Sequence, residues 1–213
     1  MEQDSAPRLA ASLAPEHDWT AAGGVILPQL RPAGTVGVDG RSLLVAASSG
    51  LPGKPLIGPG PAGLALGYVI PGNGFDILVG AEHLLSWGVG PEVVHAAAIS
   101  NLAAWSSRAP WVDDVSGDRR AISSDSSQGM DAARILLPEV RARLAAELGG
   151  IGRVLVGLPD PTGLIATGLA AGDVEFATMF AAYIAIRSDG ADEPLDARLF
   201  ELVDGELVVF DWA

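Results

Sequence analysis

The sequence predicts an α+β fold with antiparallel hairpins in a mixed sheet and helices packed on one face. Three observations predict this class: short apolar runs paired across Gly- and Pro-containing turns, long helical patterns between them, and a C-terminal hairpin signal at Asp204-Gly205. The 213 residues are enough to bury one core without disulfide bonds, and the chain contains no cysteine. The lack of cysteine excludes a thiolate zinc site and a thiol nucleophile.

Residues 1–63 form a Pro- and Gly-rich segment with weak patterning. Its strand candidates are residues 25–27 and "RSLLVAA" at 41–47, whereas "SGLPGKPLIGPGPAG" at 49–63 is typical of a loop. The pattern becomes regular from residue 64. We therefore predict an N-terminal segment, 1–63, and an α+β domain, 64–213.

The first half of the predicted domain contains a hairpin and two helices. "LALGYVI" and "FDILV" flank "PGNG", whose Gly and Asn supply the positive φ of a tight reversal. "AEHLLSWG" predicts one or two helical turns, and "GPEVVHAAAISNLAAW" a longer helix with Pro91 at its first position. The expected core face of this helix consists of Val94, Ala98, Leu102 and Trp105.

The second half continues with strands and helices in alternation. "RRAISSD" at 119–125 predicts a strand, and Pro138 interrupts a helical stretch over 131–148. "RVLVGL" and "LIAT" predict a hairpin, followed by a helix over 173–187 with Asp173 as its N-cap. Segments 68–84 and 156–174 share the order strand, turn, strand, helix, which is either a duplicated ββα unit or a common local arrangement.

The register of the C-terminal hairpin follows from a two-residue turn at Asp204-Gly205. One face of the paired strands then becomes apolar, with an ion pair at its end. The predicted pairs are Val203–Glu206, Leu202–Leu207, Phe200–Val209 and Arg198–Asp211.

The chain is strongly acidic, with a formal net charge of −13 and a pI near 4.4. Such a surface repels phosphate backbones and anionic membranes. The first residues lack the basic region and continuous apolar core of a secretory signal, and no apolar run reaches the roughly 20 residues that span a bilayer. We therefore predict a cytoplasmic protein with neither nucleic acid nor membrane as partner.

The stretch "SSDSSQGMDAARILLP" at 123–138 has two interpretations. In the first, Asp131 caps the following helix and pairs with Arg134 one turn later. In the second, the Gly129 backbone and neighbouring serines present donors to a small ligand or anion, and the binding residues are Ser127, Asp131 and Arg134. We favour the first, because Asp125 and Asp131 repel an anion and no basic residue lies within 121–133.

Other motifs indicate no catalytic or metal site. "GPGPAG" at 58–63 satisfies G-x-G-x-x-G, but its prolines remove N–H donors and a strand pattern follows. The three histidines, His17, His83 and His95, share no metal-ligand spacing, and carboxylate pairs such as Asp113–Asp114 are expected in loops. No G-x-S-x-G elbow indicates a hydrolase. We predict no catalytic residue, metal ligand or cofactor, and leave open whether the chain is an enzyme.

The helix expected at 173–187 is unusually apolar. Between Val174 and Ile186 its polar residues are Glu175 and Thr178. A helix that is apolar nearly all round is either central to a core or buried against a partner. Both interpretations stay open, and in the second the partner is another copy of the chain, giving a homodimer through helix 173–187.

Five pieces in order carry a family resemblance: "GYVIPGNGFDILVGAEHLLSWGV", "HAAAISNL", "GMDAARILLPEV", "LGGIGRVLVGLPDPTGLIATG" and "PLDARLF…DGELVVF". Residues 64–213 resemble the YtpQ-like family of uncharacterised bacterial proteins. "GMDAARILLP" is similar to the family's Asp-Ala-Ser-Arg-Leu-Leu-Leu-Pro signature, with Ala133 where serine is common. The sequence departs from the family in its shortened N-terminal segment and in the apolar helix 173–187. The resemblance implies an intracellular bacterial α/β protein and supplies no reaction.

Together these observations predict a non-catalytic protein-interaction or self-associating module. The alternative is a protein that binds a small ligand or anion through the 123–134 loop and helix start. A hydrolase is the least favoured of the three hypotheses.

Overall fold

The computed structural model describes residues 18–38, 54–72 and 76–212, and it confirms the α+β class. The expected domains 1–63 and 64–213 stay a prediction, and the contacts of the chain group it differently. The chain splits into one compact unit within Met1–Pro28, Val36–Gly58 and Gly67–Asn101, and another within Gln29–Thr35, Pro59–Leu66 and Leu102–Ala213.

The smaller of two sheets has the strand order β1-β3-β2, with β4 also paired to β3. Its strands are β1 (Leu27–Arg31), β2 (Gly58–Pro59), β3 (Ala65–Pro71) and β4 (Asp76–Leu78). The last two form the predicted antiparallel hairpin, with Ile70 opposite Ile77. The strand expected at 25–27 lies slightly later as β1, and the candidate at 41–47 falls outside the described residues. The described end of the predicted 49–63 loop holds β2 and the 3-10 turn η3 (Pro61–Gly63).

The described residues before 107 include the α-helices α2 (Trp19–Ala22), α4 (Ala81–Trp87) and α5 (Pro91–Ser106). The longest, α5, begins at Pro91 as predicted, because a proline at the first helical position sacrifices no intrahelical hydrogen bond. Its expected core residues Val94, Ala98 and Leu102 are fully buried, and Trp105 is half-buried. In the described part of the chain, no helix combines the length and apolar character needed to cross a bilayer.

Tyr68 on β3 gives the first unit a measurable pH dependence. Its hydroxyl lies 3.0 Å from His95 Nδ1, and burial raises the pKa of Tyr68 to about 12. The unfolded chain ionises this phenol near pH 10. The stabilisation is therefore fully present below about pH 10 and is lost as the pH rises towards about 12. Denaturant unfolding of the wild type should show this loss, and Tyr68→Phe should show a smaller one; equal losses in both proteins contradict the assignment.

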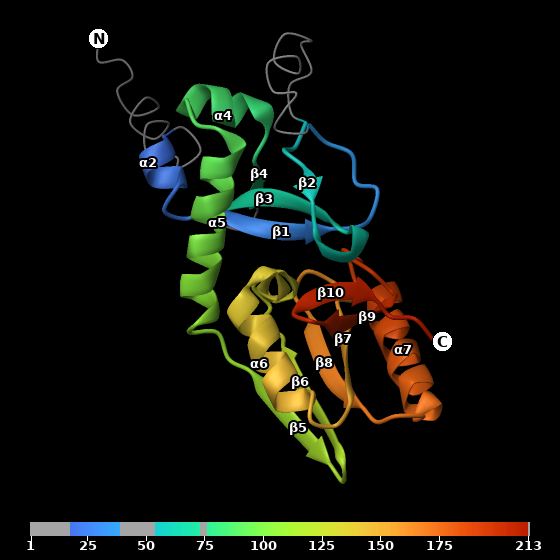
Figure 1. Cartoon of the computed structure of the whole chain (residues 1–213). Coiled ribbons are helices and arrows are strands. Elements are labelled where there is room, and N and C mark those ends of the chain that lie inside the picture. Colours follow the sequence, from blue (N-terminus) through green and yellow to red (C-terminus); the bar gives the residue numbers. More distant parts are fainter. Residues whose placement is uncertain (1–17, 39–53, 73–75, 213) are drawn as a thin grey trace, which may run out of the picture. The chain divides into compact units, whose positions relative to one another are not determined.

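The larger sheet has six strands in the order β10-β9-β7-β8-β6-β5 (Figure 1). Every neighbouring pair in it is antiparallel, so the expected mixed sheet is wrong here. The pairs β5–β6, β7–β8 and β9–β10 are consecutive in sequence, and short connections favour antiparallel neighbours. The strands are β5 (Val112–Ser116), β6 (Arg119–Ser124), β7 (Arg153–Gly157), β8 (Leu164–Leu169), β9 (Leu199–Val203) and β10 (Glu206–Val209).

The helices of this unit are the 3-10 helix η4 (Ala132–Leu136), α6 (Pro138–Leu148) and α7 (Val174–Asp189). Pro138 starts α6 afresh, as predicted, because Leu137 before it is extended. The expected inward residues of α6, namely Val140, Leu144 and Leu148, are buried. Asp173 caps α7 as predicted, accepting a hydrogen bond from the Phe176 N–H at 3.1 Å.

Helices α6 and α7 contact opposite faces of the six-stranded sheet, so the prediction of helices on one face is wrong for this sheet. A Cβ added to Gly157 on β7 would meet Ile184 of α7, whereas one added to Gly168 on β8 would meet Ile151 and the Leu148 carbonyl at the end of α6. The pairing of Gly157 with Ile165 and of Gly168 with Val154 places the two glycines on different faces. All of β8 is buried, which requires cover on both sides.

The C-terminal hairpin has the predicted register from Val203–Glu206 to Phe200–Val209. Asp204 and Gly205 both have positive φ, as the predicted turn requires. The expected Arg198–Asp211 ion pair is wrong, because β10 ends at Val209 and the Arg198 guanidinium pairs with Asp196 at 2.6 Å. Both segments of the proposed ββα repeat form an antiparallel hairpin followed by a helix, namely β3-β4-α4 and β7-β8-α7, while their duplication stays a prediction.

Candidate functional site

A hollow lies on the α7 face of the six-stranded sheet, where β6 carries small side chains. Asp114, Ala121 and Thr167 follow one another across β5, β6 and β8, and Ser123 on β6 lies opposite Ile165. Paired residues of neighbouring strands point to the same face, so all five face the α7 side. Alanine and serine fill little of the space between sheet and helix, and the hollow results from their small volume.

The hollow is a cavity of about 300 Å³ with two chemically different walls. The sheet and its loop contribute the carboxylates of Asp114 and Asp125 and the hydroxyl of Ser123. Helix α7 contributes the rings of Phe176, Phe180 and Tyr183. Apolar walls with a few polar groups are typical of small-molecule sites, and this volume lies at the small end of their range.

Arg187 closes the α7 side of this cavity with an ion-pair network. Its Nη2 lies 3.3 Å from Asp125 Oδ2 and 3.8 Å from Asp160 Oδ2. Burial alone lowers the pKa of the Arg187 guanidinium, but hydrogen bonds with Tyr183 and Asp125 and the charge of Asp160 raise it overall. The guanidinium is therefore charged at neutral pH, and two carboxylates already share its charge.

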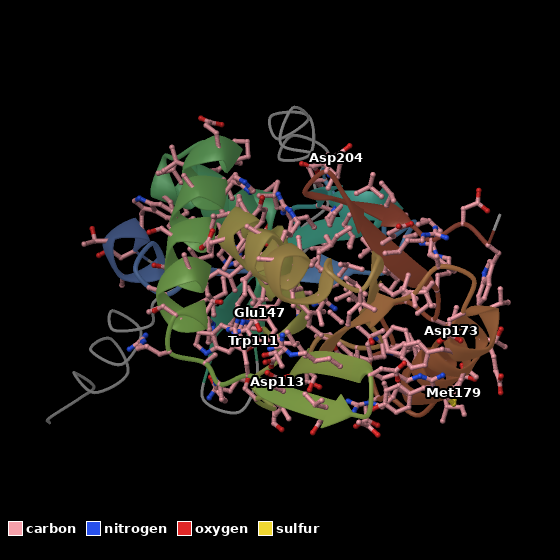
Figure 2. The ribbon with its side chains drawn as sticks, turned by 60° about the horizontal axis from the view of Figure 1, so that its bottom comes forward. Trp111, Asp113, Glu147, Asp173, Met179 and Asp204 are labelled. Carbon is pink, nitrogen blue, oxygen red and sulfur yellow. The ribbon has the colours of Figure 1, made fainter. Side chains whose placement is uncertain are left out.

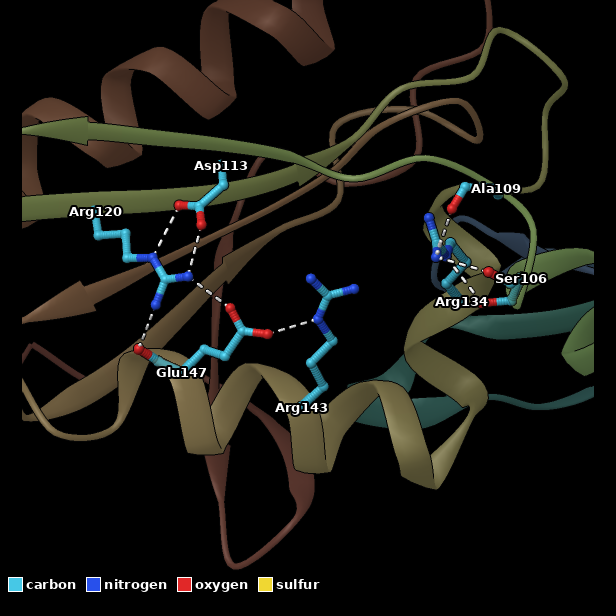
Figure 3. Close-up of polar contacts among 7 residues, drawn as sticks. All are labelled: Ser106, Ala109, Asp113, Arg120, Arg134, Arg143 and Glu147. Carbon is cyan, nitrogen blue, oxygen red and sulfur yellow. Dashed lines mark hydrogen bonds and ion pairs between the residues drawn. The ribbon is translucent and has the colours of Figure 1, made fainter.

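Arg134, one of the predicted ligand residues, is buried and bonded within the protein. Its guanidinium donates to Ser106 Oγ and to the Ser106 carbonyl, both at 3.0 Å (Figure 3). It also donates to Ser124 Oγ at 2.6 Å and to the Pro110 carbonyl at 3.1 Å. Only 1% of Arg134 is exposed, and burial lowers its pKa to about 10, so it stays charged at neutral pH. Its Cζ also lies 3.7 Å from the ring centre of Trp111, a cation–π contact.

Asp131 does not cap the helix, so that prediction is wrong. Its backbone is already helical, and its side chain makes no capping hydrogen bond. The carboxylate instead accepts from Ser124 Oγ at 2.5 Å and from Ser126 Oγ at 2.7 Å, and it is fully buried. Ser124 thus joins Asp131 to Arg134, because its hydroxyl donates to the carboxylate and accepts from the guanidinium.

Ser127, the third predicted ligand residue, is exposed and has a φ of 58°. The structure therefore joins Asp131 and Arg134 through Ser124 but shows no contact that brings Ser127 to them. The hydroxyls and the guanidinium here serve neighbouring groups of the protein, which disfavours a ligand site at 123–134. A site at these residues stays a prediction.

Asp113 and Asp114 lie on β5, so the expectation that they occupy a loop is wrong. Neighbouring strand residues point to opposite faces. Asp113 faces the α6 side, where Arg120 binds both of its oxygens at 2.8 and 2.6 Å and also contacts Glu147 at 2.6 Å (Figure 3). The hydrogen bond from Arg120 lowers the pKa of Asp113, and that from Arg143 lowers the pKa of Glu147.

Helix α7 has an outward face as well as the face that packs on the sheet. Ala177, Phe180 and Ile184 are buried. Away from the sheet, Val174, Met179 and Ile186 are 63%, 53% and 72% exposed. Met179 lies at the surface of α7 in Figure 2. Only one face of the helix therefore packs in the core, and some of its apolar side chains are exposed on the other face.

The histidines take part in local contacts rather than in a shared centre. His83 Nδ1 accepts from the Gly80 N–H at 3.0 Å at the start of α4, and His95 faces Tyr68. His17 falls outside the described residues. Within 18–38, 54–72 and 76–212, no three His, Asp or Glu side chains are grouped closely enough to hold a metal ion.

No protein-family model, curated protein or solved structure matches this chain. The resemblance to the YtpQ-like family therefore stays a prediction.

The sequence signalled one of these features and missed the other. The run "VEFATMFAAYIAI" indicated an unusual helix, and its outward apolar residues were visible in that composition. The cavity was missed because its residues come from three strands, a loop and α7. Only the strand pairing brings Asp114 and Thr167 into one row.

Proposed function

We propose that the chain is a non-catalytic module that self-associates through the outward face of α7. The observation that supports this function is the exposure of Val174, Met179 and Ile186 on a helix whose opposite face already serves the core. Contiguous exposed apolar side chains mark interaction surfaces. On α7, Met179 and Ile186 are seven positions apart and so lie on the same side, as in helices that pack against another helix.

A second copy of the chain suits this surface because the face is self-complementary. In a two-fold contact, residue i meets residue j and j meets i. An antiparallel pairing of two α7 helices centred between Ala182 and Tyr183 brings Met179 beside Ile186 of the second copy. The small, exposed Ala182 beside the centre allows the two helix axes to approach closely.

The contact between two helix faces is small. Stable interfaces bury about 1,600 Å² in total, and one helix pair buries less. The net charge of −13 also opposes association of like chains. We therefore expect a weak dimer with a Kd of roughly 1–100 µM that strengthens as salt screens the overall repulsion.

Ile186→Glu is expected to abolish the dimer, because it places two like charges in an apolar contact. Sedimentation equilibrium from about 1 to 300 µM should show the wild type shifting from monomer towards dimer across the expected Kd. The matched control is Val115→Glu, since Val115 is 68% exposed on β5 and points away from the α7 side. Circular dichroism verifies that both variants fold.

Two results would overturn this function. One is a wild-type protein that stays monomeric over the whole concentration range at raised salt. The other is an equal effect of Ile186→Glu and Val115→Glu, which would mean that charge alone, and not the α7 face, controls association.

A further inference from the structure

The cavity beneath α7 is negatively charged even though it holds a guanidinium. Asp114 and Asp125 line it, and Asp160 lies beside Arg187. Three carboxylates and one guanidinium leave a net charge of about −2 at neutral pH, and the nearby Arg119 guanidinium is paired with Asp173 at 3.4 Å, so it does not change this sum. The Arg187 guanidinium is already paired with the carboxylates of Asp125 and Asp160. An anionic ligand would have to displace them and would be repelled by the surrounding carboxylates, so the charges of the cavity disfavour anions.

Two polar groups of the cavity are available to a ligand. Among the described residues, no side chain bonds to the Asp114 carboxylate or to the Ser123 hydroxyl. The Thr167 hydroxyl, in contrast, donates to the Arg120 carbonyl at 2.8 Å. A ligand donor therefore finds its acceptors at Asp114 and Ser123, on the β5–β6 side of the cavity.

The opposite wall is aromatic and selects a flat or apolar body. Phe176 and Phe180 stack with ring centres 6.4 Å apart, and Tyr183 lies one turn after Phe180. The guanidinium of Arg119 lies 4.4 Å from the ring centre of Phe176, so this wall already holds one cation at its outer end. Aromatic faces attract cations because of their negative quadrupole.

We propose that this cavity binds a small organic amine, with its ammonium group at Asp114 and Ser123 and its apolar part against the rings of Phe180 and Tyr183. The volume of about 300 Å³ limits the ligand to a compact molecule. An ammonium offers three donors and a positive charge, which matches two acceptors on a negatively charged wall. The inference does not depend on self-association, because the outward face of α7 is not part of the cavity.

Three probes of the same shape test the charge selection: phenethylamine, phenethyl alcohol and phenylacetate. Amide chemical shifts of the full chain are followed in NMR titrations up to about 10 mM of each probe, which covers weak binding. We expect saturable shifts at Ala121, Ser123 and Thr167 with phenethylamine, weaker shifts with the alcohol and none with phenylacetate. Raised salt should lower the affinity for phenethylamine, because the attraction between its ammonium group and the cavity is partly ionic.

Asp114→Asn should lower the affinity for phenethylamine roughly tenfold, because a hydrogen bond to a charged group is replaced by one to a neutral amide. The matched control is Asp118→Asn, in the exposed turn after β5, which should leave the affinity unchanged. Ile186→Glu should also bind phenethylamine normally, so a failure of self-association and a failure of this site are distinguishable.

Either of two outcomes overturns the proposal. One is the absence of saturable shifts with phenethylamine in both the wild type and Ile186→Glu. The other is binding of phenethyl alcohol or phenylacetate as tightly as the amine, which would show that the acidic wall does not select the ligand.

Discussion

Replacing Arg134 with methionine is expected to lower the free energy of unfolding by about 3–5 kcal/mol. The guanidinium is 1% exposed and donates to two hydroxyls and to backbone carbonyls from the end of α5 and the segment after it. Methionine fills a similar volume but leaves these acceptors without their donor. It also leaves the buried Asp131 without the positive charge that Ser124 connects to it. Breaking one partner of a buried polar network costs far more than the network contributes overall.

Guanidinium chloride unfolding, followed by tryptophan fluorescence and circular dichroism, measures this loss. Arg108→Met is the matched control, because Arg108 is exposed and contacts the Ala104 carbonyl one helical turn earlier. Its effect should stay within about 0.5 kcal/mol. Similar losses in the two variants would show that the buried network contributes no more than a surface arginine.

Gly152→Ala is expected to cost about 3 kcal/mol, the second largest effect among these predictions. Gly152, just before β7, has a φ of 148°, which side chains rarely adopt. An alanine Cβ at this position would also lie 2.4 Å from the Leu169 carbonyl oxygen on the paired strand. That oxygen belongs to the backbone of β8 and cannot rotate away, so strand pairing itself must shift.

Gly150→Ala is the matched control, because it makes the same glycine-to-alanine change two residues earlier in the same loop. A Cβ at Gly150 meets no atom within 4 Å, and its φ is not positive. Alanine there should be neutral or stabilising by up to about 1 kcal/mol, because it restricts the unfolded chain. The same unfolding assay measures both variants. Equal free energies of unfolding of Gly152→Ala and Gly150→Ala would contradict the assignment of backbone strain to position 152.

The strands and helices that the sequence predicted well are those specified by local chemistry. Asp204-Gly205 fixed the register of β9 and β10 because only a two-residue turn with positive φ at both positions fits there. Pro91, Pro138 and Asp173 marked helix starts through their fixed φ or capping oxygen. By contrast, β5 was missed because "VDDVS" is exposed along its whole length and shows no apolar alternation.

The arrangement of the candidate sites depended on contacts that no local pattern contains. Arg134 donates a hydrogen bond to Ser106, which lies 28 positions earlier in the sequence. Arg187 donates to Asp125, which lies 62 positions earlier. The capping prediction for Asp131 failed because two nearby serine hydroxyls offered its carboxylate better partners than the helix N–H groups. The continuous apolar run of β8 did contain the signal for helices on both faces, since a strand buried on both sides has no polar face.

The fully exposed strand β5 has a consequence for aggregation. It forms one edge of the six-stranded sheet, and its outer backbone groups are a template on which another strand could add. Asp114 places a negative charge on the α7 side of that edge, whereas the Arg120 guanidinium binds the Asp113 carboxylate on the other side. An identical strand joining this edge in register would bring Asp114 carboxylates close together, and their repulsion disfavours growth of the sheet into fibrils.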